Sequence, residues 1–446
     1  MKKVWIIVFG LTCLGIHAQK KWSLRECVDY AVKHNLQVIQ NEYSKQSQDN
    51  NLRIAKKNSL PSVSANIGNT VSFGQISFGT GSLRNDKYSN NANINADVLV
   101  YNNGRLDKTI RKVEFDVEAS LFDIETVKND ISLQIAQQYL TTLLNKEIVK
   151  ISEAAVENAQ KQHDRAKITT EVGTTAQTVF AEAQAALARE KQNLKTAEIN
   201  VGRSLFALAQ LLQLQEYKDF DVEDVVVSDQ LTPELRSVDD VLKTAYETQP
   251  QIKAAESRIK AAEAQIEVDK TAFWPTVTAS AGIGSFYNNL LTTDNVGSVS
   301  VYIKERGLFP QYKDNFGQQA ALSVNIPIFN KGITKLQVEQ SRLNESVAKN
   351  TLEQQKQTVR QNVQQAQFDV DANYEIYLSA VETEKSTKLA LDFADKSYAA
   401  GRSTIYDVNV ARNNYANAQG SVAQAKFNYL FSLKLLNFYA GIPLSL

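Results

Sequence analysis

Apolar and polar residues alternate along residues 91–100, and a period of two is typical of a β-strand. The apolar set would lie on one face and the polar set on the other: Ala92, Ile94, Ala96, Val98 and Val100 against Asn91, Asn93, Asn95 and Asp97. A soluble sandwich would need a second sheet to cover the apolar face, and this chain has too few strands to supply one. A strand of about ten residues with one apolar face is typical of a transmembrane β-barrel.

A long helical segment follows this strand directly. Gly104 is followed by no glycine or proline until Gly173. Apolar residues recur through that interval with a mean spacing of about 3.6, the period of an amphipathic helix. A helix over the whole interval would be roughly 100 Å long at 1.5 Å per residue. The sequence therefore predicts a membrane strand that continues into a very long helical rod.

This strand-and-rod pattern occurs twice in the chain. The matching segments are residues 24–35 and 238–249, Pro61 and Pro275, residues 101–104 (Tyr-Asn-Asn-Gly) and 329–332 (Phe-Asn-Lys-Gly), and Gly173 and Gly401. The interval from Gly332 to Gly401 also has the same length as the interval from Gly104 to Gly173. We therefore expect two tandem repeats, residues 19–215 and 237–446, joined by an acidic linker over residues 216–236.

Each repeat predicts the same four elements in the same order. These are a helix of about 38 residues, a β-hairpin, the long helix and a returning helix of about 40 residues. The expected ranges are 22–59 and 238–273 for the first helix, about 61–103 and 275–331 for the hairpin, and 174–213 and 402–439 for the returning helix. Polar loops are expected inside the hairpins at residues 75–90 and 285–319, and one short strand in the linker.

The first 18 residues predict a signal peptide. Lys2 and Lys3 precede an apolar run over residues 4–16, and His17-Ala18 ends a small-residue cleavage site. The mature chain is therefore expected to be exported. Its only cysteine would be Cys27, so no disulfide can form within it.

The charged residues give no sign of chemistry or of nucleic-acid binding. The chain holds 49 Lys and Arg residues against 49 Asp and Glu residues, so it has no basic surface for nucleic acid. Only His34 and His163 remain after the predicted cleavage, and no metal-ligand spacing or nucleophile–base–carboxylate grouping occurs. We expect no enzyme activity, no cofactor and no metal site.

The predicted strands are too few to close a barrel. Two hairpins supply four strands, whereas the smallest natural membrane barrels have about eight. An open sheet would leave main-chain N–H and C=O groups unpaired in lipid, at several kcal/mol each. Two chains would supply eight strands and three chains would supply twelve, which is enough for a channel. The chain is therefore expected to be an obligate oligomer.

Three features of the chain resemble the TolC family of outer-membrane efflux and secretion channels. They are the two turns after the hairpins, the strands that start at a proline, and residues 398–408 (Tyr-Ala-Ala-Gly-Arg-Ser-Thr-Ile-Tyr-Asp-Val). The resemblance covers nearly the whole mature chain. It implies an α+β membrane protein that forms a homotrimer, with a twelve-stranded barrel in the outer membrane and an α-helical tunnel in the periplasm. It also implies a passive exit duct of a tripartite efflux or type I secretion system, whose partners are a periplasmic adaptor and an inner-membrane RND or ABC pump.

The resemblance implies that Asp407 lies at the narrowest point of the tunnel. Three such carboxylates on a threefold axis would raise one another's pKa and attract cations. The alternative is a solvated aspartate in the first turn of a helix, where the helix dipole favours a negative charge. A second acidic ring, three residues further on, is absent because that position is Val410.

Two more gate residues, Tyr398 and Thr178, match the family's closing latch between neighbouring coiled coils. The arginine and aspartate of that latch are replaced by Ser403 and Val179 in this chain. The closed state is therefore expected to be held differently, with Arg402 as a candidate. Tyr398 as a half-buried coiled-coil residue is the equal alternative.

The resemblance further implies that Gly173 and Gly401 mark the periplasmic tips, where the adaptor docks. A tight reversal favours a positive φ, although any glycine that ends a helix would look the same. Asp97 on the polar strand face should point into the barrel lumen. An interfacial aromatic belt and core packing are two interpretations of Trp22, Trp274 and Tyr101.

Two other functions share some of these features. A periplasmic adaptor also has long helical hairpins, but it needs lipoyl-like and barrel segments rich in glycine and valine. A purely structural coiled-coil protein would not need two hairpins whose apolar faces match a bilayer.

Overall fold

The computed structural model describes residues 21–78, 80–225, 237–291 and 306–442. The predicted signal peptide, residues 1–18, lies outside the described residues. The chain forms two compact units, each drawn from both halves of the sequence. Unit 1 comprises the described parts of Met1–Tyr43, Phe122–Lys253 and Glu353–Leu446, and unit 2 comprises Ser44–Leu121 and Ala254–Leu352.

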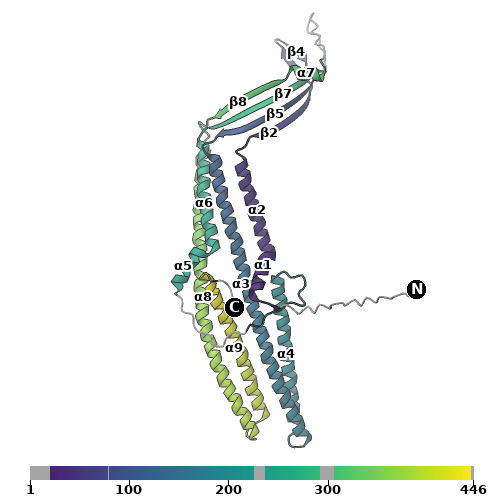
Figure 1. Ribbon diagram of the computed structural model, residues 1–446, viewed down its shortest axis with the longest axis vertical. Helices are drawn as coiled ribbons and strands as arrows, with labels where there is room; N and C mark the ends of the chain where they lie inside the picture. Colours follow the sequence, from purple (N-terminus) through teal and green to yellow (C-terminus); the bar gives the residue numbers. More distant parts are fainter. Residues whose placement is uncertain (1–20, 79, 226–236, 292–305, 443–446) are drawn as a thin grey trace, which may run out of the picture. The chain divides into compact units, whose positions relative to one another are not determined.

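Helices make up most of the described residues (Figure 1). The helices are α1 (Leu24–His34), α2 (Leu36–Lys57), α3 (Arg105–Glu171), α4 (Gln177–Leu211), α5 (Val238–Thr248), α6 (Pro250–Lys270), α7 (Leu308–Asp314), α8 (Ile333–Ala399) and α9 (Ile405–Tyr439), with a 3₁₀ turn at Thr271–Phe273. The strands are β1 (Lys21–Trp22), β2 (Ser62–Ser72), β3 (Gln75–Phe78), β4 (Gly81–Arg84), β5 (Lys87–Tyr101), β6 (Asp221–Val222), β7 (Thr276–Leu290) and β8 (Gly317–Asn325).

Unit 2 contains an antiparallel sheet of four strands in the order β2-β5-β7-β8 (Figure 1). In its register Ile94 of β5 pairs with Ala65 of β2 and Ile283 of β7, while the next polar position, Asn93, pairs with Asn66 and Gly284. Side chains at paired positions point to the same face of a sheet. The alternation along each strand therefore gives the sheet one apolar and one polar face. Among the described strands, β2 and β8 each pair on one side only.

The strands extend further into the predicted loops than the sequence indicates. The β5–β7 pairing runs from Tyr101 with Val277 to Lys87 with Leu290, because main-chain hydrogen bonds hold polar residues in strands as readily as apolar ones. A small hairpin of β3 and β4 occupies much of the first loop. Helix α7 occupies part of the second, where its Tyr312 carbonyl accepts a hydrogen bond of 2.7 Å from the Ser285 hydroxyl.

The first helix of each predicted repeat is broken, which corrects the prediction of one helix of about 38 residues. Asn35 separates α1 from α2, with ψ at 128°, and its side-chain oxygen accepts a hydrogen bond of 2.8 Å from the Gln37 N–H. Gln249 separates α5 from α6, with ψ at 122°. It precedes Pro250, whose ring disfavours the helical conformation of the preceding residue. The two breaks fall at equivalent positions of the sequence alignment.

The long helices α3 and α8 are each 67 residues long. Each begins after two residues with positive φ, Asn103-Gly104 in one case and Lys331-Gly332 in the other. This pair of left-handed residues turns the chain sharply from the sheet end into a helix, and glycine adopts that conformation without a steric penalty.

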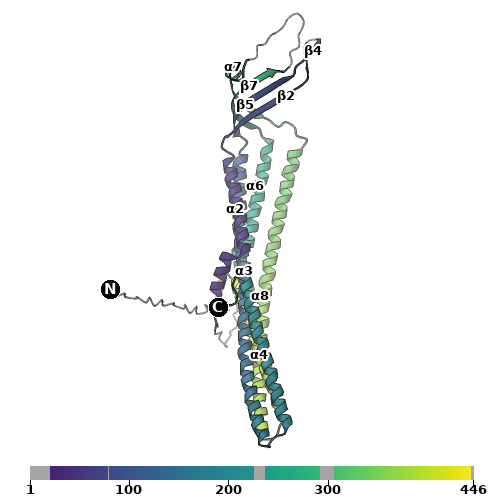
Figure 2. The same ribbon diagram turned by 90° about the vertical axis from the view of Figure 1, so that its right-hand side faces the viewer.

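The hydrophobic core of unit 1 is built around α3. Ile135 and Tyr139 of α3 are completely buried, together with Cys27 of α1, Leu208 of α4 and Val222 of β6. Helices α3 and α4 lie side by side in this unit, as Figures 1 and 2 both show. Burial raises the pKa of the Cys27 thiol to about 12, so this free cysteine stays protonated and unreactive.

Strands β1 and β6 form a short parallel pair that packs on α3. The Tyr139 hydroxyl is shared between the carbonyl oxygens of Trp22, at 3.1 Å, and Glu223, at 3.3 Å. Lys146 of α3 donates to the Val222 carbonyl at 2.8 Å and lies 2.7 Å from the Asp221 carboxylate. These contacts join the start of the mature chain to residues some two hundred positions later.

Of the two interpretations of Trp22, core packing is therefore confirmed, because its side chain is partly buried against the core of unit 1. Its ring packs edge-on against Tyr30 and Phe220, with centroids 5.2 and 5.8 Å apart. The pairing of β1 with β6 is non-local, so the local sequence around Trp22 carries no sign of it. Trp274 and Tyr101 do lie at one end of the sheet and are both exposed.

We expect Tyr139→Phe to lower the free energy of unfolding by about 1–3 kcal/mol, because it leaves the Glu223 carbonyl without its buried donor. Denaturant unfolding of the full chain in detergent measures the change. Tyr406→Phe, at a residue that is 67% exposed, removes the same atom from the surface and should change stability by less than about 0.5 kcal/mol. Equal effects of the two substitutions would contradict a structural role for the buried hydroxyl.

Candidate functional site

The two helix reversals in unit 1 have the same geometry. After α8, Gly401 has a φ of 69°, its N–H donates to the Tyr398 carbonyl at 2.9 Å, and the Arg402 N–H donates to the Ser397 carbonyl at 2.9 Å. After α3, Gly173 has a φ of 81° and the equivalent two bonds are made. This is the Schellman motif, which pairs the last carbonyls of a helix and needs a left-handed residue. Both predicted tip glycines are therefore required by backbone geometry.

Asp407 caps the helix that follows the second reversal. The Thr404 N–H and the Thr404 hydroxyl donate to Oδ2 of Asp407 at 2.9 and 2.7 Å, and the Asp407 N–H donates to the Thr404 hydroxyl at 3.3 Å. This reciprocal arrangement is a capping box. The hydrogen bonds from the Thr404 backbone and side chain hold the pKa of the Asp407 carboxyl below its usual range. The first reversal lacks this feature, because Ala176 occupies the capping position.

The other predicted gate residues lie around the same two reversals. Tyr398 is half-buried in the last turn of α8, while Arg402 and Thr178 are exposed, in the turn and in the first turn of α4. Among the described residues, no hydrogen bond or ion pair joins these three side chains to one another or to Asp407. A gate built from them would therefore need neighbouring chains, and it stays a prediction.

An ion pair near the second reversal was not predicted. Nη2 of Arg412 on α9 lies 3.6 Å from the Asp395 carboxylate on α8, and the Arg412 side chain is mostly buried. The sequence does place opposite charges on the two sides of the turn at Gly401. The distance of each charge from the turn differs, however, so the pairing depends on how the two helices pack.

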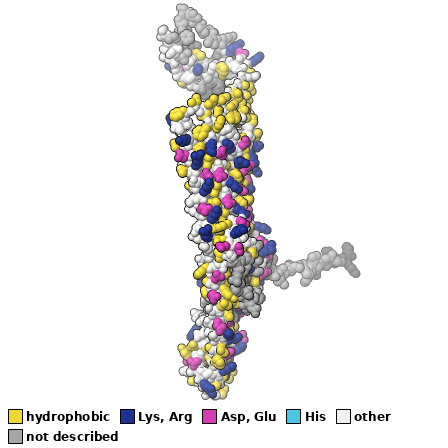
Figure 3. Space-filling view, turned by 90° about the vertical axis from the view of Figure 1, so that its left-hand side faces the viewer, with side chains coloured by type: hydrophobic (Ala, Val, Ile, Leu, Met, Phe, Trp, Pro, Cys, Tyr) yellow, Lys and Arg dark blue, Asp and Glu magenta, His cyan; other side chains and the backbone are white. Residues whose placement is uncertain are grey.

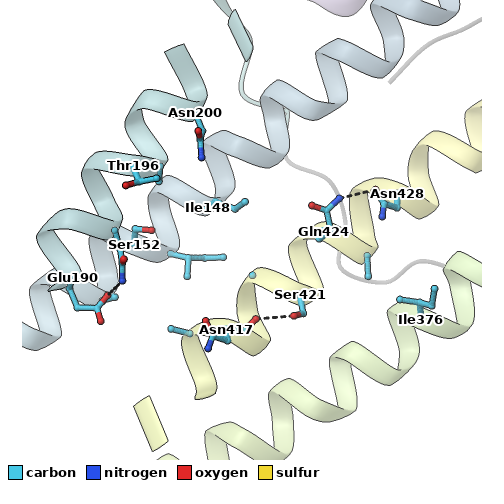
Figure 4. Close-up of a pocket in the computed structure, with 17 residues that line it drawn as sticks. Ile148, Ser152, Glu190, Thr196, Asn200, Ile376, Asn417, Ser421, Gln424 and Asn428 are labelled. Atoms are coloured by element: carbon cyan, nitrogen blue, oxygen red, sulfur yellow. Dashed lines mark hydrogen bonds between the residues drawn. The ribbon is translucent and has the colours of Figure 1, made fainter. Parts of the chain in front are cut away.

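A groove of about 780 Å³ in unit 1 is bordered by α3, α4, α8 and α9 (Figure 4). Its polar lining comes mainly from α4 and α9: Glu190, Asn193, Thr196, Asn200, Asn417, Ser421, Gln424 and Asn428. Glu190 is the only ionisable residue among those that line it. The polar positions on α9 recur every three or four residues, so this stripe is visible in the sequence as one helix face. It was not among the candidate sites expected from the sequence.

Asp97, the residue predicted to point into the barrel lumen, belongs to the sheet of unit 2 and to its polar face. Asp97 lies on this face of β5, where it pairs with Ser62 and Ser280, and it is exposed. No set of three or more His, Cys, Asp or Glu residues within the described part of the chain could hold a metal ion. A search of the described helices found none with the length and hydropathy to span a membrane.

The chain matches the family described as outer membrane efflux protein over residues 28–213 and 241–441. The chain belongs to the outer membrane efflux protein family. The assignment of the chain to this family, made from the turns and from residues 398–408, is thus confirmed. Its predicted location in the outer membrane is confirmed as well.

Several members of this family are similar to the chain in sequence. Outer membrane protein TolC of Escherichia coli is 26% identical over 69% of this chain and 60% of its own length. The pyoverdine export outer membrane protein OpmQ of Pseudomonas putida is 23% identical over 70% of this chain and 62% of its own length. The matches thus span about three fifths of these two relatives. The outer membrane efflux protein BepC of Brucella suis is 22% identical over 97% of this chain and 88% of its own.

Solved structures of channels have the same fold. The crystal structure of CusC, which concerns transmembrane channel formation, superposes with a TM-score of 0.75. The match covers 94% of this chain and 92% of its own, at 17% identity. The open state of the MtrE outer membrane channel of Neisseria gonorrhoeae superposes with a TM-score of 0.73 over 94% of this chain and 89% of its own, at 19% identity. The mixed helix-and-strand architecture of the family is therefore present in this chain.

Replacing Gly401 by alanine should destabilise the second reversal by about 1 kcal/mol, because a Cβ in the left-handed region is strained. No neighbouring atom lies within 4 Å of the added Cβ, so the effect would come from the backbone alone. Gly202→Ala is the matched control, since Gly202 lies inside α4 and also has open space around it. It should stabilise the protein by about 0.5–1 kcal/mol through helix propensity. Denaturant unfolding measures both, and changes of the same sign would exclude the left-handed requirement.

Proposed function

We propose that this protein is the outer-membrane exit duct of a tripartite efflux or type I secretion system and works as a homotrimer. The observation that carries the proposal is the four-stranded sheet of unit 2, which has one apolar face and two edge strands, β2 and β8, paired on one side only.

The apolar face of the sheet suits lipid rather than water. Ile67, Leu322 and Val324 on this face are between 53% and 74% exposed, which is a large cost for a soluble surface. Figure 3 shows a band of hydrophobic side chains at the sheet end of unit 2, with Lys, Arg, Asp and Glu side chains intermixed along its helices. An apolar band bordered by charged surface is what a bilayer selects.

The unpaired edges of the sheet demand further strands. Each main-chain group left unpaired in hydrocarbon costs several kcal/mol, so an open sheet cannot remain in a membrane. A second copy of the same chain supplies a β2 edge for the β8 edge of the first. Three copies would supply twelve strands, and a barrel of that size leaves room for an aqueous channel.

The helices of unit 2 give independent support for an oligomer. Leu336, Leu343 and Val347 on α8 are 57–64% exposed, and their spacing places them on one face of the helix. An exposed apolar stripe along a helix usually packs against another helix. Neighbouring copies in a ring of helices would cover this stripe and enclose a tunnel that continues from the barrel.

The duct would conduct passively. OprN and MtrE, whose solved structures share this fold, are outer-membrane channels by name, and the chain carries no recognised nucleotide-binding or catalytic motif. Energy and substrate choice would come from an inner-membrane RND or ABC pump, reached through a periplasmic adaptor. The reversals at Gly173 and Gly401 are the proposed docking tips for that adaptor. A periplasmic adaptor or a structural coiled coil would leave the apolar face of the sheet without a purpose.

The proposed gate lies at the second reversal, with Asp407 as its charged group and Tyr398, Thr178 and Arg402 around it. Threefold symmetry would bring three Asp407 carboxylates toward the tunnel axis, where they would attract cations. The hydrogen bonds of the capping box lower the pKa of each Asp407 carboxyl, which opposes the increase expected from the two neighbouring carboxylates. The Asp407 side chain would then fulfil two functions, since it caps the first turn of α9 and gives the constriction a negative charge.

In lipid vesicles, spin labels at Ile94 and Val324 should be reached by oxygen dissolved in the bilayer and protected from a water-soluble nickel chelate. A label at Asn95, the neighbouring residue on the polar face, should show the reverse, because it would face an aqueous lumen. The same preparation in detergent should have the mass of three chains and dissociate on heating. Labels at Ile94 and Val324 in water, or a stable and functional monomer, would contradict the proposal.

Asp407→Asn should raise the divalent-cation concentration that half-blocks single-channel current in planar bilayers, by about tenfold, because three charges leave the constriction. Asparagine retains a side-chain oxygen that can accept the Thr404 hydrogen bonds, so the start of α9 is preserved. Asp392→Asn, at an exposed aspartate on α8, removes the same charge from the same helical hairpin and should leave block unchanged. Unchanged block in Asp407→Asn would exclude a gating role for this residue.

A further inference from the structure

Three asparagines form a row along the polar face of β5. Asn91, Asn93 and Asn95 occupy alternate positions of the strand, so their side chains point to the same face. We call this row the amide ladder. Its length is about 14 Å, since alternate residues of a strand are about 6.8 Å apart.

Glycines on both neighbouring strands make room for the amide ladder. A Cβ on Gly68 of β2 would lie 2.4 Å from Oδ1 of Asn91. Cβ atoms on Gly284 and Gly282 of β7 would lie 2.2 Å and 2.7 Å from Oδ1 of Asn93 and Asn95. Real Cβ atoms do not approach other atoms so closely. The asparagine side chains therefore lie flat over glycine backbone, in space that any larger residue would occupy.

The ladder forms one wall of a groove of about 300 Å³. Asn315, Gln318 and Gln319 add three further amides to its lining. Phe286 of β7, which is 47% exposed, adds an aromatic ring on the same face as Asn91, with which it pairs. None of the residues that line the groove is ionisable. The groove is thus strongly polar, uncharged and partly aromatic.

The ladder amides make no hydrogen bond with any group in the described part of the chain. The opposite face of the same strands differs in this respect. There Asn69 accepts hydrogen bonds from the Tyr88 hydroxyl at 2.7 Å and the Asn90 amide at 2.6 Å. Asparagines on one face therefore satisfy each other, whereas those of the ladder keep their donors and acceptors available to a solute.

From this geometry we propose that the amide ladder and Phe286 form a binding subsite for a neutral, hydroxyl-rich solute, such as a short oligosaccharide. Each amide offers two N–H donors and a carbonyl acceptor, and a sugar hydroxyl both donates and accepts. An anionic solute would find no positive charge in the groove to offset its lost hydration, and an apolar solute would leave the amides unpaired. The ring of Phe286 offers a flat apolar surface for the C–H face of a sugar.

The location of this subsite in a lumen rests on the proposed function, whereas its binding chemistry does not. In a twelve-stranded trimer the polar face would line the barrel, and three amide ladders would surround the path of the solute. Repeated weak contacts of this kind hold a solute in the pore without trapping it. Binding to the purified protein can be measured without any assumption about conduction.

Isothermal titration of the full-length protein with maltohexaose, in a detergent without a sugar headgroup, tests the proposal. We expect millimolar binding, and no binding of hexaglutamate. Asn93→Ala combined with Asn95→Ala should weaken maltohexaose binding at least tenfold, since each lost amide removes one or more hydrogen bonds. Gly284→Ala keeps every amide but displaces that of Asn93, and should weaken binding about threefold or more.

Two controls match these variants. Asn69→Ala removes an amide from the opposite face of the sheet and should leave binding unchanged. Gly74→Ala adds a Cβ at the end of β2, where no atom lies within 4 Å, and should also leave it unchanged. Thermal unfolding of each variant separates a lost site from a lost fold.

Absence of maltohexaose binding, or equal affinity of Gly284→Ala and Gly74→Ala, would overturn the subsite. If the spin-label and mass measurements support a trimeric barrel while maltohexaose does not bind, the subsite fails and the proposed function stands. If maltohexaose binds with the expected pattern of variants but the protein is monomeric, the proposed function fails and the subsite stands.

Discussion

Main-chain N–H and C=O groups that face hydrocarbon must all be paired, because lipid offers no hydrogen-bonding partner in place of water. In the four-stranded sheet of this protein, the outer sides of β2 and β8 have no partner strand among the described residues. If this sheet spans the outer membrane, as proposed, its two open edges require strands from further copies of the chain. The proposed trimer, its lumen and its function as a duct all depend on this single constraint.

The helical part depends on a different constraint, which is the satisfaction of helix ends. Two 67-residue helices each end in a Schellman motif at a glycine with positive φ, and the second reversal adds a capping box through Asp407. Asp407, the residue expected to give the gate its negative charge, thus also stabilises the first turn of α9. Ionisation and helix capping are therefore linked at this position, since the hydrogen bonds that stabilise the helix start also lower the pKa of the carboxyl.

Much of the architecture could be predicted from the sequence because its signals are local. A period of two over residues 91–100 identifies a strand, and a long interval without glycine or proline identifies a helix. The positions of Gly173 and Gly401 mark the reversals, since a left-handed residue is a property of one residue and its neighbours. Asp407 also belongs to a local sequence pattern, because a threonine three residues before an acidic residue is typical of a capping box.

Other features depended on contacts between distant residues, which only the tertiary structure could decide. Trp22 is a core residue because β1 pairs with β6, and the amide ladder exists because Gly68, Gly282 and Gly284 lie opposite asparagines in the sheet register. The break at Asn35 is visible only in the folded chain, where an asparagine inside an apparently continuous helix adopts an extended conformation. Periodicity determined the kind of each element in this protein. Pairing register and packing determined its ends, its neighbours and the side chains that stay available for binding, because those depend on free energies shared between segments far apart in the chain.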